Sequence, residues 1–353
     1  MREFFPHTYR GSIRKMLKLI NRYNIFLAVT VIITLILLSI TFLNYTVSPS
    51  DNKSKTSTVI IPRGSGFLKV TDILYKAGII KYRPFFCLLA VLENAPKRIK
   101  AGEYELVSSM SPIEIIDKLV RGDIKRYPVL IPEDITLREI TAHLVSLGLV
   151  NEGEFMTLAS DPSFLVSLGI DGATVEGYLY PDTYTFNRAM GAREIIETMV
   201  HQFWKKVTPE MINRAGELGL TVSEFVTLAS IIGKESGLSD EKLIVSAVFH
   251  NRLKKGMKLQ SDPTAVYDVK YFDGNIKRSD LRRNIPHNTY KISGLPPSPI
   301  ANPGIDSLYA ALWPADVDYL YFVSKNDGSH HFSPNLTAHH KAVLKYQIKM
   351  KKN

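Results

Sequence analysis

The sequence is poor in cysteine, because Cys87 is the only one among 353 residues. No disulfide can form within the chain, so any part of it outside the cytoplasm must be stabilised by its apolar core. The stretch around this cysteine, Phe85-Phe-Cys-Leu-Leu89, is apolar. A buried, unreactive thiol is therefore favoured over a nucleophile.

Motifs of several common enzyme classes are also missing. The sequence has no Gly-x-Ser-x-Gly elbow, no glycine-rich phosphate loop and no His-Glu-x-x-His pair. Four histidines near the C-terminus could suggest a metal, namely His330, His331, His339 and His340. Their spacing fits no common zinc site and cysteine ligands are absent, so structural or substrate hydrogen bonds are favoured. We expect neither a metal nor a cofactor.

The positive charge is unevenly distributed. The formal net charge is +10, and residues 1–22 supply half of it. A second group of lysines lies near the C-terminus, and no basic stripe is interleaved with aromatic residues. The pattern does not indicate nucleic acid as a partner.

One long apolar run, Ile25–Leu43, contains nineteen uncharged residues, enough to cross a bilayer as a helix. A removable signal peptide would have a shorter apolar region followed by a small-residue cleavage site, and neither feature is evident here. The basic segment 1–24 precedes the run, which places the N-terminus in the cytoplasm. We therefore predict a single-pass protein of the cytoplasmic membrane, with segment 44–57 as a polar linker and the remainder outside the cytoplasm.

An internal repeat with an offset of seventy residues begins after the linker. Ile61-Pro62 and Ile131-Pro132 each start a segment with matching apolar positions and a glycine, Gly78 or Gly148. Each copy is predicted to be a strand ending at proline and then a helix closed by glycine. Between the copies we expect a helix at 83–93, a strand at 102–107 and a helix at 111–121. The sequence thus predicts a small α+β module at about 58–128 and a related half-module that leads into the next domain.

Residues 151–220 are predicted to be mainly helical, and the aromatic-rich stretch Val175–Phe186 leaves two interpretations open. It is either a strand and turn lining the core, or a wall on which sugars stack, with Glu176 and Asp182 as hydrogen-bonding groups. Long polar loops rich in proline and glycine follow beyond residue 256, and ordered loops that shape a cleft are the better interpretation. Further elements are expected as helices at 240–255 and 305–312, a strand at 319–323, a turn at 326–328 and a basic terminal helix.

The stretch Thr221–Ser236 has the features of an amphipathic helix. Thr221-x-x-Glu224 is a capping box, and apolar residues follow at helical spacing. Glu235 falls at the edge of the apolar stripe, where partial desolvation would raise its pKa and favour a protonated acid. The alternative is a solvated glutamate in the last turn.

Glutamates are scarce in the C-terminal third, which narrows the choice of acid. Only Glu235 and Glu241 follow Glu224, and Glu241 lies at a helix start, where it complements the dipole. Glycoside hydrolysis normally needs two carboxylates. Asp262 is the obvious second one, although Asp in Ser-Asp-Pro commonly just forms a turn.

Several motifs in fixed order resemble one known family, the YceG-like (MltG) endolytic murein transglycosylases. They are Leu228-Ala-Ser-Ile-Ile-Gly-Lys-Glu235, Phe249-His-Asn-Arg-Leu253, Gly256-Met-Lys-Leu-Gln-Ser-Asp-Pro-Thr264, Asn288-Thr-Tyr290, Gly294-Leu-Pro-Pro297 and Tyr319-Leu-Tyr-Phe-Val323. The family's catalytic glutamate falls on Glu235. An earlier glutamate of the same motif is replaced here by Gly233, and His287, before Asn288, also departs from the pattern.

The resemblance implies an α+β fold with an N-terminal transmembrane helix, a LysM-like module at 58–128 and a mixed helical and strand catalytic domain at 129–353. It implies non-hydrolytic cleavage of the MurNAc–GlcNAc β-1,4 bond in nascent peptidoglycan, with Glu235 as acid and then base. Because the sugar's own C6 hydroxyl is the nucleophile, one carboxyl group serves both steps. Motif membership and polarity make four residues candidates for the saccharide cleft: Gln260, Asp262, Asn288 and Tyr290. Glycan strands, the membrane and peptidoglycan synthases are the expected partners. The alternative is a catalytically silent wall-binding or scaffold protein, which Gly233 favours.

Overall fold

The computed structural model describes residues 7–51, 55–269, 272 and 274–349. The chain divides into two compact units, Met1–Lys125 and Arg126–Asn353. Each unit has its own core of buried apolar side chains. The mixed α+β class predicted from the sequence is confirmed.

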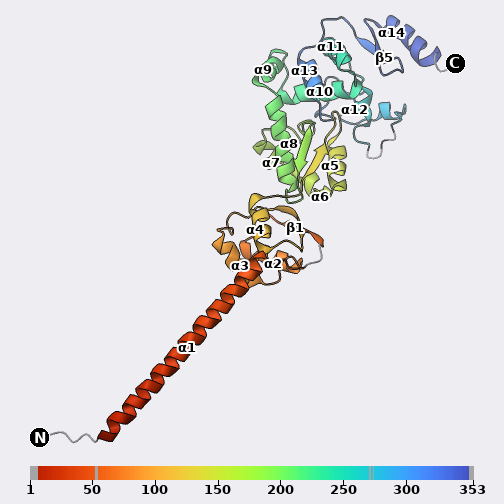
Figure 1. Cartoon of the computed structure of the whole chain (residues 1–353). Helices are drawn as coiled ribbons and strands as arrows, with labels where there is room; N and C mark the ends of the chain where they lie inside the picture. Colours follow the sequence, from red (N-terminus) through yellow and green to blue (C-terminus); the bar gives the residue numbers. More distant parts are fainter. Residues whose placement is uncertain (1–6, 52–54, 270–271, 273, 350–353) are drawn as a thin grey trace, which may run out of the picture. The chain divides into compact units, whose positions relative to one another are not determined.

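The first unit begins with one long helix, α1 (His7–Val47), drawn in red in Figure 1. Its segment Met16–Val47 is long and apolar enough to cross a membrane and is exposed in the structure. The Thr30 and Thr34 hydroxyls donate to carbonyls one turn earlier, at 2.9 and 2.8 Å. An apolar helix whose hydroxyls are satisfied internally is compatible with a lipid environment.

The predicted linker at 44–57 is too long at both ends. Helix α1 continues to Val47, and strand β1 already begins at Thr56. The helix ends just before Ser48-Pro49, because a residue that precedes proline disfavours helical backbone. Residues 52–54, and 1–6 of the predicted cytoplasmic segment, lie outside the described residues.

The rest of the first unit is a strand-helix-helix-strand module with one added helix. Its elements are β1 (Thr56–Ile61), α2 (Phe67–Lys76), α3 (Arg83–Leu92), β2 (Gly102–Val107) and α4 (Pro112–Arg121). The two strands are antiparallel, with Thr56 opposite Val107 and Ile61 opposite Gly102. Helix α4 starts with the capping box of Ser111 and Glu114. The predicted elements 83–93, 102–107 and 111–121 are confirmed within one residue.

Aromatic contacts hold the end of α1 against this module. Phe42 lies edge-on to Phe85, with ring centroids 5.8 Å apart, and Tyr45 contacts both Phe85 and Tyr82. Cys87 is only partly buried, on α3, within 3.9 Å of the Thr71 hydroxyl. The thiol therefore lies at the edge of the core of the first unit.

The second unit opens with the second copy of the repeat, and that copy is complete. Its elements are β3 (Tyr127–Leu130), α5 (Leu137–Ser146), α6 (Glu152–Leu158), α7 (Pro162–Ser167) and β4 (Thr183–Phe186). Strands β3 and β4 are antiparallel, like β1 and β2. The prediction of a half-module is thus wrong, because β4 completes the second copy, and this pairing could not be read from the sequence since the partner strand lies more than fifty residues away along the chain.

The matching positions of the two copies have the same structural roles. Val70 and Ile140 are both buried, and the hydroxyls of Thr71 and Thr141 each donate to the carbonyl four residues earlier. The glycines that follow the two helices, Gly78 and Gly148, have φ of +70° and +65°. A left-handed residue after a helix is the expected use of glycine.

The remaining elements form the C-terminal part of the second unit. They are α8 (Ala192–Lys206), α9 (Pro209–Glu217), α10 (Val222–Glu235), α11 (Ser239–Lys254), α12 (Asp262–Val266), the 3-10 turn η1 (Asp280–Arg282), α13 (Ile305–Leu312), β5 (Tyr321–Ser324), β6 (His330–Ser333), α14 (Leu336–Val343) and the π-helical turn η2 (Leu344–Lys349). Strands β5 and β6 form a hairpin around the predicted turn. Strand β6 is not predicted, because His330-His-Phe-Ser shows no apolar alternation.

Candidate active site

Helix α10, labelled in Figure 1, carries Glu235 as its last residue. The capping box predicted at its start is present, with the Thr221 amide donating to Glu224 at 2.9 Å. Every residue from Phe225 to Gly233 is buried, so the helix is covered on all sides rather than on one face. Ser230 fits this interior because its hydroxyl donates to the Thr227 carbonyl and accepts from the Ile300 amide.

The carboxyl group of Glu235 is partly buried and is held by a hydrogen bond from a neighbouring loop. Its Oε1 accepts a hydrogen bond from the Ser261 hydroxyl at 2.5 Å. Burial raises the pKa of Glu235 to about 7, the Ser261 hydrogen bond opposes this rise, and the nearby charge of Asp262 adds to it. A carboxyl group with a pKa near 7 exchanges protons easily at neutral pH, as a group that is acid and then base must.

The loop that supplies Ser261 is fixed by a neighbouring loop through buried threonines. The Ser261 amide donates to Thr289 Oγ1 at 2.9 Å, and the Gln260 amide donates to the Thr289 carbonyl at 3.2 Å. Thr289 also shares a hydrogen bond with the Thr264 hydroxyl at 2.8 Å. Neither Ser261 nor Thr289 was predicted as a site residue, although both lie inside the family motifs.

Three of the four predicted cleft residues have side chains at the surface of this site. Gln260 is exposed and its φ is +50°, which is uncommon for a residue other than glycine. Asp262 begins α12, and its Oδ1 accepts from the Tyr290 hydroxyl at 2.5 Å. Asp262 is thus more than a turn residue, because it joins the two loops beside Glu235.

Asn288 is placed differently, in the interior. Its amide donates to the carbonyls of Leu281 and Arg283 at 3.2 and 2.7 Å, and its Oδ1 accepts from the Tyr290 amide at 3.0 Å. The side chain is fully buried. Its polar atoms hold the loop that carries Tyr290, so Asn288 positions the site rather than lining it.

Arg252 is a further candidate for a functional residue and was not predicted from the sequence. Its side chain comes from α11, is 7% exposed, and donates to the carbonyls of Leu259 and Leu320 at 2.6 and 2.7 Å. The guanidinium charge lowers the pKa of Glu235 and so partly offsets the effect of burial. The signal that could have found it was its place in the Phe249–Leu253 motif.

The aromatic stretch Val175–Phe186 lines the core, which decides between the two interpretations. Tyr178, Tyr180 and Tyr184 are at most 7% exposed, so their rings are not available for sugars to stack on. Glu176 is buried beneath them, and burial raises its pKa to about 7. It accepts hydrogen bonds from the Leu137 amide, from Asn302 Nδ2 and from the Tyr267 hydroxyl, at 2.8, 2.8 and 3.0 Å.

A cavity of about 560 Å³ is lined by residues of the second copy of the repeat, by Lys234 of α10 and by α12 with the residues after it. Lys234 and Pro263, the neighbours of Glu235 and Asp262, contribute to its wall together with Leu137 and Tyr267. Its volume is in the range of small-ligand pockets. Glu235 and the four predicted cleft residues are not among the residues that line it.

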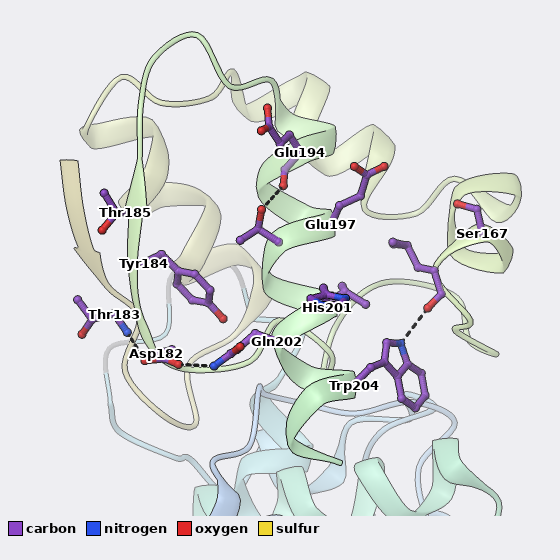
Figure 2. Close-up of a pocket in the computed structure, with 13 residues that line it drawn as sticks. Ser167, Asp182, Thr183, Tyr184, Thr185, Glu194, Glu197, His201, Gln202 and Trp204 are labelled. Atoms are coloured by element: carbon purple, nitrogen blue, oxygen red, sulfur yellow. Dashed lines mark hydrogen bonds between the residues drawn. The ribbon is translucent and has the colours of Figure 1, made fainter. Parts of the chain in front are cut away.

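A larger hollow of about 720 Å³ lies elsewhere in this unit, between β4 and α8 (Figure 2). Asp182 lies here, where it accepts from Gln202 Nε2 at 2.7 Å. Trp204 in turn donates to the Leu168 carbonyl at 2.9 Å. Asp182, which one interpretation of the sequence made a sugar-binding group, lines this hollow, whereas Glu235 and the four predicted cleft residues do not.

The histidines near the C-terminus make local contacts. His330 Nδ1 lies 2.7 Å from Glu241 Oε2, and the His330 amide donates to Oε1 of the same carboxylate. His339 stacks on Tyr321 and His331 lies near Tyr346. Among the residues that the structure describes, no group of three or more His, Cys, Asp and Glu side chains could hold a metal ion.

Comparisons with known proteins agree with the motifs. The profile of the YceG-like family matches residues 59–345. The endolytic murein transglycosylase of Bacillus subtilis (strain 168) is 33% identical over 318 residues, which cover 84% of this chain and 87% of that protein. A protein of the same name from Streptococcus pneumoniae serotype 2 is 30% identical over 84% of this chain, which spans only 59% of that longer protein.

The fold of this chain is also similar to that of a solved structure. A yceG-like protein of Listeria monocytogenes is 32% identical, with a TM-score of 0.57. The match covers 81% of this chain and 98% of the Listeria chain. Its crystal structure and the family profile lead to the same assignment, so the chain belongs to the YceG-like family, as its motifs predict.

Proposed function

We propose that this protein is a membrane-anchored endolytic lytic transglycosylase. It cleaves the β-1,4 bond between MurNAc and GlcNAc within peptidoglycan strands and leaves 1,6-anhydroMurNAc ends. The enzyme class follows from relatives named endolytic murein transglycosylase that are 30–33% identical over most of this chain. The single observation that carries the mechanism is Glu235, a carboxyl group at the end of α10 that accepts a hydrogen bond from Ser261 and whose pKa burial raises to about 7.

One carboxyl group is sufficient for this reaction. Protonated Glu235 donates its proton to the glycosidic oxygen as the bond from that oxygen to C1 of MurNAc breaks. The C6 hydroxyl oxygen of the same MurNAc then bonds to C1, and its proton passes to the Glu235 carboxylate, which restores the acid. No water is consumed, so a second carboxylate to activate water is not needed.

The neighbouring side chains support both halves of this cycle. Ser261 donates to Glu235 and stabilises the carboxylate that forms after the first proton transfer. Gln260, Asp262 and Tyr290 are proposed to bind the saccharide, with Asp262 and Tyr290 acting as a hydrogen-bonded pair. Asn288 contributes by holding the loop of Tyr290. No cofactor takes part.

The remaining proposals concern where the enzyme works. Helix α1 is proposed to span the cytoplasmic membrane once, with the N-terminus inside and both units outside. The β-α-α-β module of the first unit is proposed to be LysM-like, which is consistent with its paired strands and two helices. Peptidoglycan strands are the substrate, and synthases that extend them are the proposed partners.

The test uses the full-length protein in detergent and purified peptidoglycan. Mass spectrometry of the released fragments should show anhydro ends, which are one water lighter than hydrolysed ends. Glu235→Gln keeps the size of the side chain but cannot transfer a proton, so we expect a loss of at least about 100-fold. Glu210→Gln, at an exposed glutamate of α9, is the control and should remain active.

Three results would reject the proposal in different ways. Reducing ends from the wild type would indicate a hydrolase. No cleavage at all by a folded wild-type protein would favour the silent wall-binding or scaffold protein that Gly233 suggests. Undiminished anhydro products from Glu235→Gln would move the catalytic role to another residue.

A further inference from the structure

The replacement of the motif's glutamate by Gly233 has a visible counterpart in the structure. A Cβ atom added to Gly233 would lie 1.8 Å from Asp134 Oδ1 and 2.5 Å from Asp134 Cγ. No side chain fits there without displacing this carboxylate. The space beside the last turn of α10 is therefore filled by Asp134, which comes from the loop after β3.

The backbone of Asp134 is one that normally favours glycine. Its φ is +62°, and the residue seventy positions earlier, in the first copy of the repeat, is Gly64 with φ of +70°. The two loops thus share a left-handed residue, but only the second carries a side chain there. An aspartate in this conformation costs free energy relative to a glycine, so contacts made by its carboxylate must offset that cost.

The carboxylate of Asp134 faces a buried cation. Lys242, on α11, is 3% exposed, and its Nζ lies 3.9 Å from Asp134 Oδ2 and 3.5 Å from Glu133 Oε2. Burial raises the pKa of Asp134 to about 6, and the charge of Lys242 opposes this rise. A buried ammonium group that loses a counter-ion is strongly destabilising. Asp134 therefore links three segments: its own loop, α10 at Gly233, and α11 at Lys242.

The loop of Asp134 is held firmly enough to act as a support. The Asp134 amide donates to the Asn302 carbonyl at 2.8 Å, and the Asn302 amide donates back to the Ile135 carbonyl at 3.0 Å. The Asn302 side chain adds a bond to the Ile135 carbonyl and another to Glu176. The carboxylate is thus presented to α10 by a rigid segment.

We propose that Asp134 supplies, from this loop, the carboxylate that the motif otherwise carries at position 233. Asp134 is a positioning residue, which acts through the last turn of α10 and through Lys242 on the orientation of Glu235. The inference rests on the proposed catalytic role of Glu235. Gly233 then marks a relocated carboxylate and not a lost one, which removes the feature that favoured a silent protein.

The test moves the carboxylate between the two positions in the full-length protein. Asp134→Gly suits the backbone but removes the charge, and we expect activity to fall about 10-fold through kcat with little change in KM. Gly233→Glu alone places a side chain against Asp134, and we expect a lower Tm and a similar loss of activity. The double variant Asp134→Gly with Gly233→Glu should recover activity to within about 3-fold of wild type.

A matched variant separates charge from packing. Asp134→Gly combined with Gly233→Gln fills the same space without a carboxylate, so we expect recovery of Tm without recovery of kcat. The proposal is wrong if Asp134→Gly keeps full activity, or if the glutamate and glutamine double variants behave alike. A wild-type protein without transglycosylase activity would instead refute the proposed function, while the Tm values would still report whether positions 134 and 233 are coupled.

Discussion

The proton affinity of Glu235 is set by opposing contributions from a few neighbours. Burial raises its pKa, while the Ser261 hydroxyl and the charge of Arg252 lower it. The result, about 7, leaves a large fraction of the group protonated at neutral pH. Each neighbour therefore offers a way to shift the pH dependence of the enzyme without removing the catalytic group.

Ser261→Ala should shift the pH profile in a defined direction. The hydroxyl donates to Glu235 and favours the carboxylate, so its removal raises the pKa of Glu235 further. Because the reaction begins from the protonated acid, kcat/KM falls as the pH rises through this pKa. We expect the falling limb of kcat/KM to move to higher pH in the variant, measured as formation of anhydro ends between pH 5 and 9.

The control for this experiment is Ser146→Ala, at a serine on α5 whose hydroxyl donates only to the nearby His143 carbonyl. Its profile should coincide with that of the wild type. A limb that stays in place or moves to lower pH in Ser261→Ala would mean that the hydroxyl has a different role, such as a contact with the sugar.

At the scale of elements, the site is a junction between one helix end and two loops. Helix α10 brings Glu235, the loop before α12 brings Ser261, and the loop after η1 brings Tyr290. Thr289 connects the two loops through bonds to the Ser261 amide and the Thr264 hydroxyl. The geometry around Glu235 thus depends on a side chain that does not touch it.

Thr289→Val keeps the shape of this side chain and removes its hydroxyl. The Ser261 amide then loses its acceptor in a buried place, which costs about 1–3 kcal/mol. We expect a lower Tm and about a 10-fold loss of activity, since Ser261 is no longer held against Glu235. Differential scanning fluorimetry and the muropeptide assay measure the two effects.

The control is Thr185→Val, at an exposed threonine of β4. It should leave both the Tm and the activity close to wild type. A Thr289→Val protein with a lower Tm but full activity would show that the threonine stabilises the fold without positioning the site.

The elements themselves could be predicted from the sequence where the signal is local. Helix α13 has the predicted bounds Ile305–Leu312, and the capping box at Thr221 correctly marks the start of α10. Helical periodicity and capping residues depend on only a few neighbouring residues, so helix bounds can be predicted from the local sequence. A strand within Val175–Phe186 was one of the two interpretations left open, but the pairing of β4 with β3 was not predicted, because β3 lies more than fifty residues away along the chain.

The site could be predicted only in part for the same reason. Glu235 was singled out by the scarcity of glutamates and by motif order. The placement of Asn288 in the interior could not be inferred, because an amide on the surface and one that binds backbone carbonyls look alike in sequence. Asp134 could not be singled out from the sequence, because its role depends on its position beside Gly233, about a hundred residues later.

At the scale of the whole molecule, the anchor and the first unit form one packed body. The rings of Phe42 and Tyr45, at the end of α1, contact Phe85 and Tyr82 of the module. Each aromatic pair contributes about 0.5–1.5 kcal/mol beyond its buried area. The helix is thus part of the module as well as its proposed connection to a membrane.

Removing the anchor should therefore have two separate effects. A chain that begins at Ser48 should leave the membrane fraction, whereas the full-length protein should stay there after washing with high salt. The same truncation removes Phe42 and Tyr45, so we expect a lower Tm and more aggregation than for a chain that begins at Thr41. Fractionation and thermal unfolding of the three proteins test the two effects independently.

Equal Tm values for the two truncated chains would show that the aromatic contacts add no stability. Full-length protein that washes off with salt would show that α1 does not cross a bilayer. The first result would not affect the prediction that α1 spans a membrane. The second would not affect the prediction that the aromatic contacts stabilise the first unit.

The packed end of α1 also determines how such a protein can search its surroundings. In a bilayer, the first unit would diffuse laterally and rotate about the helix axis, but it would not reorient freely as a domain on a flexible linker does. Its encounters with the wall would then be a search in two dimensions. The rate at which this unit meets new strands would depend on lateral diffusion in the lipid, and on how densely nascent strands cover the area that it sweeps.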